Sequence, residues 1–192
     1  MEHKKFKHSL DKHDCHEMGF SAEVIFKQLA EGKGYSVRVA GREEQFSHVD
    51  FILEKDSKEW RIDVKGAKRI KRTDKEVNYH TTWLEWKTGH GKDGWLVADK
   101  GCENIAFELE NEFVIVSRKE LKKLAEKLCD LTKRVDSPKK ALYCGYKRFG
   151  RQDLLSIIKT EDLKQIQHSI WPKKITSSQQ ASSSLTITAK AS

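Results

Sequence analysis

The sequence predicts an α/β domain in which a mixed β-sheet is flanked by helices. Apolar residues recur with the helical period of about 3.6 in some stretches and with the strand period of about two in others. The two kinds of stretch are interspersed, and glycine, proline and short polar runs separate them. At 192 residues the chain is long enough for one domain with a sizeable core.

Composition divides the chain into three parts. Residues 1–17 are rich in lysine and histidine and hold little apolar material, which indicates a flexible basic arm. Residues 18–171 carry the periodic patterns and are expected to form the folded domain. Residues 172–192 consist mostly of Ser, Gln, Thr and Ala, and their small apolar surface predicts a disordered tail.

The first elements are a helix and three strands. Apolar residues of the segment 18–32 fall on one arc at about 100° per residue, which predicts a helix. The alternating runs 35–40, 48–54 and 60–66 predict strands. Because the polar segment 55–58 between the last two is short, these two strands are expected to form a hairpin.

Further strands and helices follow. Strands are expected at 81–87, from residue 95, and at 104–110, 113–116, 141–146 and 154–158. The first two flank the glycine-rich segment 88–94, which indicates a long hairpin loop. Ser117 and Glu120 match a capping box that opens a helix through about Leu131, and a short final helix is expected from Thr160.

Charge and cysteine usage bound the function. The 37 Lys and Arg against 29 Asp and Glu, with a pI near 9.2, favour a polyanionic partner such as nucleic acid. The four cysteines are far apart and no secretory signal precedes them, which indicates a reducing, cytoplasmic location. No apolar stretch approaches the roughly 20 residues that span a bilayer, so no membrane role is expected.

The hairpin is the segment with the clearest chemical content. A two-residue turn at Asp56-Ser57 would place an apolar side, including Val49, against the core. The same register would place Asp50 opposite Asp63 on the other side of the hairpin. His48 would then lie opposite Lys65, which points the same way as Asp63.

Two carboxylates across a strand pair, with Cβ atoms roughly 5 Å apart, repel each other unless a cation lies between them. Mg²⁺ is held by one or two carboxylates together with substrate phosphates, which Asp50 and Asp63 could provide. Lys65 could orient an attacking water or stabilise charge on a phosphate. The alternative is a solvated strand face on which Arg61 and Lys65 neutralise the aspartates.

The order of a helix with Glu23, a strand with Asp50, and Asp63-Val64-Lys65 resembles the PD-(D/E)XK nuclease superfamily over about residues 18–66. The resemblance implies a restriction-endonuclease-like fold with Mg²⁺ or Mn²⁺ as cofactor. It implies that Asp50, Asp63 and the Val64 carbonyl bind the metal and that Lys65 is the catalytic lysine.

The resemblance also gives Glu23 a role as a further acidic site residue on the first helix. The alternative for Glu23 is an exposed ion pair with Lys27, four residues along the helix. The sequence departs from the superfamily pattern at Val49, which stands where the proline of the name would be.

Basic residues that follow the hairpin are the expected nucleic-acid-binding residues, with a solvated loop as the alternative. They are Lys68, Arg69, Lys71, Arg72 and Lys75. His48 and Glu85 are weaker candidates for the site, and Glu85 would be an outer metal ligand or a surface ion-pair partner. The tryptophans are interpreted as core residues rather than base-stacking platforms.

The expected function is therefore that of a metal-dependent endonuclease of restriction, repair, recombination or junction-resolving type, with DNA favoured as substrate. One alternative is a basic module that binds nucleic acid or protein without cutting it. Another is an RNA-cutting enzyme with the same site. The sequence leaves the oligomeric state open, and a dimer is compatible with it.

Overall fold

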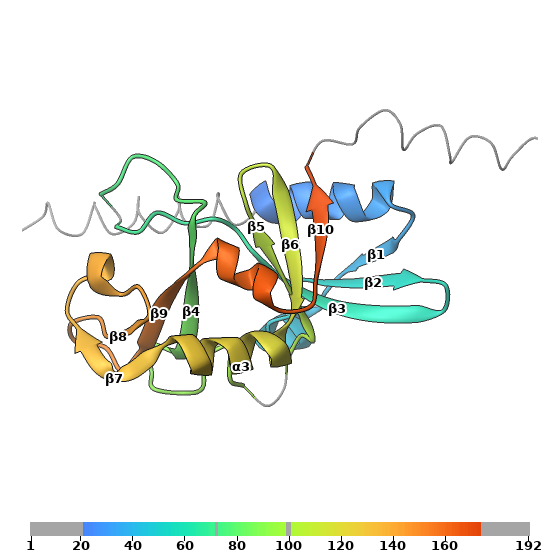
Figure 1. Cartoon of the computed structure of the whole chain (residues 1–192). Coiled ribbons are helices and arrows are strands. Elements are labelled where there is room, and N and C mark those ends of the chain that lie inside the picture. Colours follow the sequence, from blue (N-terminus) through green and yellow to red (C-terminus); the bar gives the residue numbers. More distant parts are fainter. Residues whose placement is uncertain (1–20, 72, 99–100, 174–192) are drawn as a thin grey trace, which may run out of the picture.

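The computed structural model describes residues 21–71, 73–98 and 101–173. The predicted arm, Arg72 and the predicted tail beyond residue 173 lie outside these residues. The described chain forms two mixed β-sheets flanked by a few helices (Figure 1), so the α/β class and the mixed sheet are confirmed at this level. No helix in the described ranges is long and apolar enough to cross a membrane.

The larger sheet has six strands in the order β1-β2-β3-β5-β6-β10, and only the β3–β5 pair is parallel. Its strands are β1 (Ser36–Val39), β2 (Phe51–Lys55), β3 (Lys58–Lys65), β5 (Asn104–Glu108), β6 (Glu112–Ser117) and β10 (His168–Pro172). The smaller sheet has four strands in the order β4-β9-β8-β7. Its strands are β4 (Thr81–Lys87), β9 (Leu154–Lys159), β8 (Cys144–Tyr146) and β7 (Asp130–Val135).

The helices lie against these sheets. A helix over residues 21–32 precedes β1, and α3 (Arg118–Leu128) runs beneath both sheets in Figure 1. A short α2 (Arg42–Phe46) connects β1 to β2. The 3₁₀ helices η1 (Pro138–Lys140) and η2 (Thr160–Gln165) complete the described elements.

The β2–β3 hairpin has the predicted register. Phe51 pairs with Ile62 and Lys55 with Lys58, which leaves a two-residue turn. The turn residues Asp56 and Ser57 have φ values of 51° and 59°, the left-handed conformation that a two-residue hairpin of type I′ requires at both positions.

The glycine-rich segment 88–94 forms the expected hairpin loop, since Lys87 and Asp93 make an antiparallel bridge and the Gly94 N–H donates to the Trp86 carbonyl at 2.9 Å. The strand expected from residue 95 is wrong, because β4 pairs with β9 instead. After the loop, the Leu96 N–H donates to the Glu85 carbonyl at 3.3 Å. Gly94 permits the close approach, because a Cβ at this position would lie 2.3 Å from the same carbonyl oxygen.

Other boundaries shift for local reasons. Ser117 precedes α3 without the side-chain hydrogen bond of a capping box, and the Arg118 N–H donates to the Glu103 carbonyl at 2.8 Å. The helix ends at Leu128 rather than Leu131, since the chain turns into β7. The final helix from Thr160 is of the 3₁₀ type. The elements α2, β7 and β10 are not predicted from the residue pattern.

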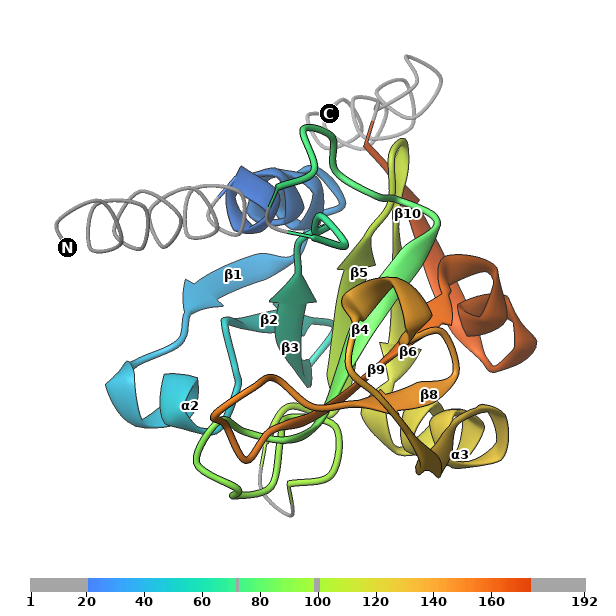
Figure 2. The same cartoon turned by 90° about the vertical axis from the view of Figure 1, so that its left-hand side faces the viewer.

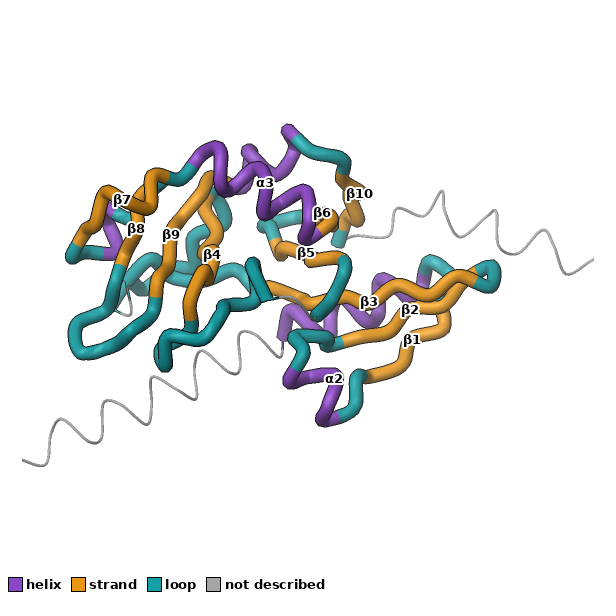
Figure 3. The backbone as a smooth tube through the Cα atoms, turned by 90° about the horizontal axis from the view of Figure 1, so that it is seen from below, coloured by secondary structure: helices purple, strands orange, loops and turns teal. Residues whose placement is uncertain are grey.

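Two cores bury both faces of the six-stranded sheet. Phe26 of the helix over 21–32 packs on one face, with its ring centroid 6.2 Å from that of Phe51 and 5.2 Å from that of Trp171. The other face shares a core with α3 and the smaller sheet. Figure 3 shows the two sheets side by side. The second half of strand β3 is therefore covered on both sides, and Asp63 within it is desolvated.

Candidate active site

Strand β3 carries the expected Asp-x-Lys pair on the face that is turned away from the helix over 21–32. Ile62 and Val64 belong to the core under that helix, so the alternating Asp63 and Lys65 side chains point to the opposite face. Only 2% of Asp63 is exposed. Lys65 is half-buried, and its ammonium lies 5.1 Å from the ring centroid of Trp95.

The pairing around Asp50 differs from the prediction. The regular register ends at Phe51–Ile62, and the Asp50 N–H donates to the Ile62 carbonyl at 2.9 Å. Two residues of one strand thus face one residue of the other, which is a β-bulge. The bulge re-aims the Asp50 side chain, whose Oδ2 accepts the Val64 N–H at 2.7 Å.

The same bulge overturns the expectation that Val49 faces Val64 within a single apolar side. Val49 is buried in the core shared with the smaller sheet, together with Ile52, whereas Val64 is buried under the helix over 21–32. The extra residue at the bulge changes the face on which the preceding side chain falls.

Asp63 is a buried acid that lies beside Lys65 and Asp50. Its Oδ2 lies 2.6 Å from Lys65 Nζ, yet this buried oxygen has no hydrogen-bond partner among the described residues. Burial raises the pKa of Asp63 to about 7, and the nearby Asp50 raises it further while Lys65 opposes the shift. Near neutral pH this carboxyl group therefore exchanges between a neutral and a charged form.

A cleft of about 790 Å³ opens beside Lys65, between the segment that follows β3 and the smaller sheet. We call it the basic cleft, because cations outnumber carboxylates in its lining. The cations are Lys65, Lys68, Arg69, Lys71 and Arg148, and the carboxylates are Glu85, Glu108 and Asp136. One of these carboxylates is neutralised, since Glu108 accepts from Lys173 Nζ at 2.9 Å.

The two weaker candidates both line the basic cleft. Glu85 reaches it from β4 of the smaller sheet. Burial raises the pKa of Glu85, whereas the Trp95 N–H and the nearby Lys65 lower it. Burial and Lys65 lower the pKa of His48, which favours the neutral imidazole. The structure thus brings Glu85 and His48 near Lys65, although they come from different segments of the fold.

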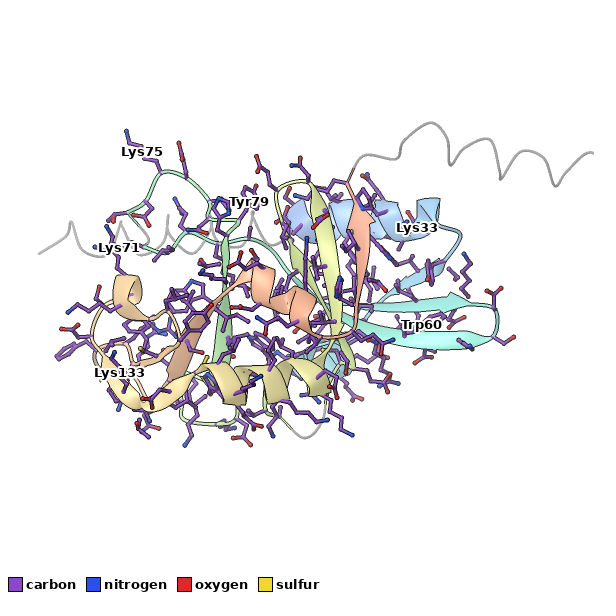
Figure 4. The ribbon with its side chains drawn as sticks, viewed as in Figure 1. Lys33, Trp60, Lys71, Lys75, Tyr79 and Lys133 are labelled. Atoms are coloured by element: carbon purple, nitrogen blue, oxygen red, sulfur yellow. The ribbon has the colours of Figure 1, made fainter. Side chains whose placement is uncertain are left out.

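The predicted nucleic-acid-binding residues lie at different distances from the cleft. Lys68, Arg69 and Lys71 line it, and the Lys71 N–H is anchored by Asp74 Oδ2 at 2.8 Å. Lys75 is exposed beyond the lining, near the tip of the same segment in Figure 4. Arg72 lies outside the described residues.

Glu23 is half-buried on the helix that covers the other face of the six-stranded sheet. The alternative pairing partner, Lys27, binds Glu31 at 2.6 Å. A role for Glu23 beside Asp63 thus stays a prediction.

Several residues near the site were missed by the sequence analysis. Trp95 packs under Lys65 from the loop after β4, and Arg148 enters the cleft from the segment after β8. Buried Cys102 lies nearby, and burial, with a contribution from Asp63, raises the pKa of its thiol to about 12. No sequence signal marks these neighbours, because the fold alone brings their segments together.

The donor set fits a divalent cation that is shared with a ligand. No group of three or more His, Cys, Asp and Glu in the described residues forms a metal site by itself. Asp50 and Asp63 provide two carboxylates, and Mg²⁺ is commonly bound by one or two carboxylates with water and phosphate oxygens. Asp63 Oδ2, which is ion-paired with Lys65 Nζ at 2.6 Å but accepts no hydrogen bond within the described ranges, is the candidate atom to bind such a cation.

Comparison of the chain with protein-family models, curated proteins and solved structures gives no match. The site therefore has to be interpreted from its own geometry.

Proposed function

We propose that this chain is a metal-dependent nuclease that hydrolyses phosphodiester bonds, with DNA as the favoured substrate and Asp50, Asp63 and Lys65 as its central residues. The observation that carries the proposal is the buried Asp63 carboxyl group beside Asp50, with its Oδ2 2.6 Å from Lys65 Nζ. Two acidic side chains that adjoin a single lysine leave negative charge that a divalent cation would neutralise.

In this proposal Asp50 and Asp63 hold Mg²⁺ or Mn²⁺, and the Val64 carbonyl is a third candidate ligand. The bound metal would supply a Lewis acid for the phosphate and a more acidic bound water. Lys65 has three N–H donors and lines the basic cleft. It orients the attacking water and stabilises negative charge on the phosphate, which is electrostatic stabilisation by a prepositioned cation.

The rest of the molecule supports the same proposal. Lys68, Arg69 and Lys71 extend the positive lining from Lys65 outward, where phosphates of a bound strand would neutralise them. We also propose that the six-stranded sheet with the helix over 21–32 is a restriction-endonuclease-like core. The thiols of Cys102, Cys129 and Cys144 are free and buried, which supports a cytoplasmic location for the enzyme.

The proposal is tested by incubating supercoiled, linear, single-stranded and branched DNA, and a single-stranded RNA, with Mg²⁺, Mn²⁺ or chelator. The wild type is compared with Asp63→Asn and Lys65→Met. Exposed Glu126→Gln on α3 and Lys133→Met on β7 are matched controls for the loss of one charge. We expect metal-dependent cutting by the wild type and both controls, and none by the two site variants.

Cutting by both site variants at the wild-type rate would show that the chemistry lies elsewhere. A wild type that binds DNA but cuts none of the substrates with either metal would assign the chain to the alternative class of non-catalytic binding modules.

A further inference from the structure

The smaller sheet presents an aromatic pair to the basic cleft. Trp83 of β4 and Tyr146 of β8 lie on strands that β9 separates, and their rings meet across it with centroids 5.8 Å apart. Both residues are half-buried and both line the cleft. Figure 2 shows β4, β9 and β8 together on the side of the molecule that faces the viewer.

This pair differs from the neighbouring tryptophan on the same strand. Trp86 points to the opposite face of β4, is 6% exposed, and donates its Nε1–H to Ser156 Oγ at 2.9 Å. It is a satisfied core residue, as the sequence analysis expected for the tryptophans. Trp83 keeps part of its ring surface at the cleft, so the core interpretation does not account for it.

Charged groups surround the aromatic pair in a pattern that suits a nucleotide. Glu85 follows Trp83 by two residues on the same face of β4, roughly 7 Å along the strand, and is electrostatically coupled to Lys65. Arg148 lines the cleft near the pair, and its Nε–H is held by the buried carboxylate of Asp153. A guanidinium has further N–H donors, so Arg148 is a fixed cation that can bind a phosphate.

We propose that Trp83 and Tyr146 form a stacking platform for unpaired bases, so that the ligand of the basic cleft is a single strand or an unpaired end of nucleic acid. The link between this platform and catalysis rests on the proposed function, whereas the binding of unpaired bases to the platform does not. Aromatic side chains stack on the π-faces of unpaired bases, and these faces are covered by neighbouring pairs in a duplex. A volume of about 790 Å³ is within the range of small-ligand pockets and suits the bases of one strand.

A second aromatic pair provides the matched control. Trp60 of β3 and Tyr35 are also half-buried and have ring centroids 5.6 Å apart, but they do not line the basic cleft. Figure 4 shows Trp60 on the β2–β3 hairpin, at the opposite end of the molecule from the loop with Lys71. Trp60→Leu therefore removes the same ring from a comparable packing environment without touching the cleft.

The test measures binding of labelled DNA of equal length in chelator, where no metal-dependent cutting occurs. Three probes are compared at one salt concentration: a single strand, its duplex, and a strand with the same phosphates but abasic positions in its centre. We expect the wild type to bind the single strand about tenfold more tightly than the other two probes. Trp83→Leu and Tyr146→Leu should each remove most of this preference, whereas Trp60→Leu should keep it.

Equal affinity of the wild type for all three probes would overturn the platform, even where Trp83→Leu fails to fold. Unchanged preference in folded Trp83→Leu and Tyr146→Leu would overturn it as well. Preference for the single strand without any cutting would support the platform and contradict the nuclease proposal. The protein could instead cut single strand and duplex alike, bind no probe preferentially, and cut unchanged in Trp83→Leu. This result would contradict the platform and support the nuclease proposal.

Discussion

Asp63 on β3 and Asp153 after β8 are both almost completely buried, with 2% and 1% of their surfaces exposed. Asp153 accepts hydrogen bonds at both oxygens, from the Arg148 N–H at 3.0 Å and from Arg148 Nε–H. Asp63 has a lysine beside it but an oxygen without a hydrogen bond among the described residues, and its pKa is raised to about 7. The two aspartates are therefore equally buried but differ in the hydrogen bonds that their carboxyl groups accept. One aspartate fixes a loop, and the other is ion-paired with Lys65 but keeps a pKa raised by burial.

The largest expected contrast is in catalysis. Asp63→Asn keeps the shape of the side chain and removes its charge, so we expect cutting to fall by at least about 100-fold. The free energy of unfolding at pH 8 should change little, since the variant avoids burying a carboxylate but also loses its ion pair with Lys65. Single-turnover cleavage and urea titration measure the two effects. A variant that loses stability and keeps activity would show that Asp63 is structural.

Asp153→Ala should act on stability. It removes both hydrogen bonds to Arg148 and leaves a partly buried guanidinium without its partner, which costs about 3 kcal/mol of unfolding free energy. Urea denaturation followed by tryptophan fluorescence measures the change. A loss below about 0.5 kcal/mol would place Asp153 among ordinary surface residues and remove its contrast with Asp63.

The pH dependence of stability should separate Asp63 from other acids. Its pKa is about 7 in the folded metal-free protein against a model value of 3.8, so between pH 4 and 7 the folded state binds a proton that the unfolded state lacks. Stability therefore falls as pH rises through this window and is level above it. Subtracting the pH–stability profile of Asp63→Asn from that of the wild type isolates this fall. Identical profiles for the two proteins would contradict the raised pKa of Asp63.

The smallest effect concerns the positive lining of the cleft. Lys71→Ala should weaken binding of single-stranded DNA for all sequences and lower the slope of log K against log salt concentration by about 0.7, the value for one phosphate contact with a single strand. Lys133→Ala on exposed β7 should leave the slope unchanged. Equal slopes for the wild type and both variants would remove Lys71 from the binding surface.

The sequence predicted the hairpin because local rules determine it. The alternation of β2 and β3 and the short Asp56-Ser57 turn specify the register, and this register is observed. It also brought Asp50, Asp63 and Lys65 into one region. The bulge at Asp50 has no sequence signature, so the hydrogen bond from the Val64 N–H and the position of Val49 could not be predicted.

Elements whose stability comes from distant contacts were missed for a related reason. Strand β10 is short, ends in Pro172 and shows little alternation, yet Trp171 stacks on Phe26 from the far end of the chain. Likewise Glu85, Trp83 and Arg148 reach the cleft only because the smaller sheet lies beside β3. Residue patterns determine which side chains share a strand face, whereas the packing of the two sheets determines which faces meet.

Buried Cys102 can report chemically on local opening of the region around Asp63. Thiol reagents attack the thiolate, and burial both hides this sulfur and keeps its proton in place, with a pKa of about 12. Alkylation of the native protein therefore has to wait for a local fluctuation that exposes Cys102. The rate of labelling then measures how often the segments around Asp63 separate, and any ligand that holds them together will slow it without touching the sulfur.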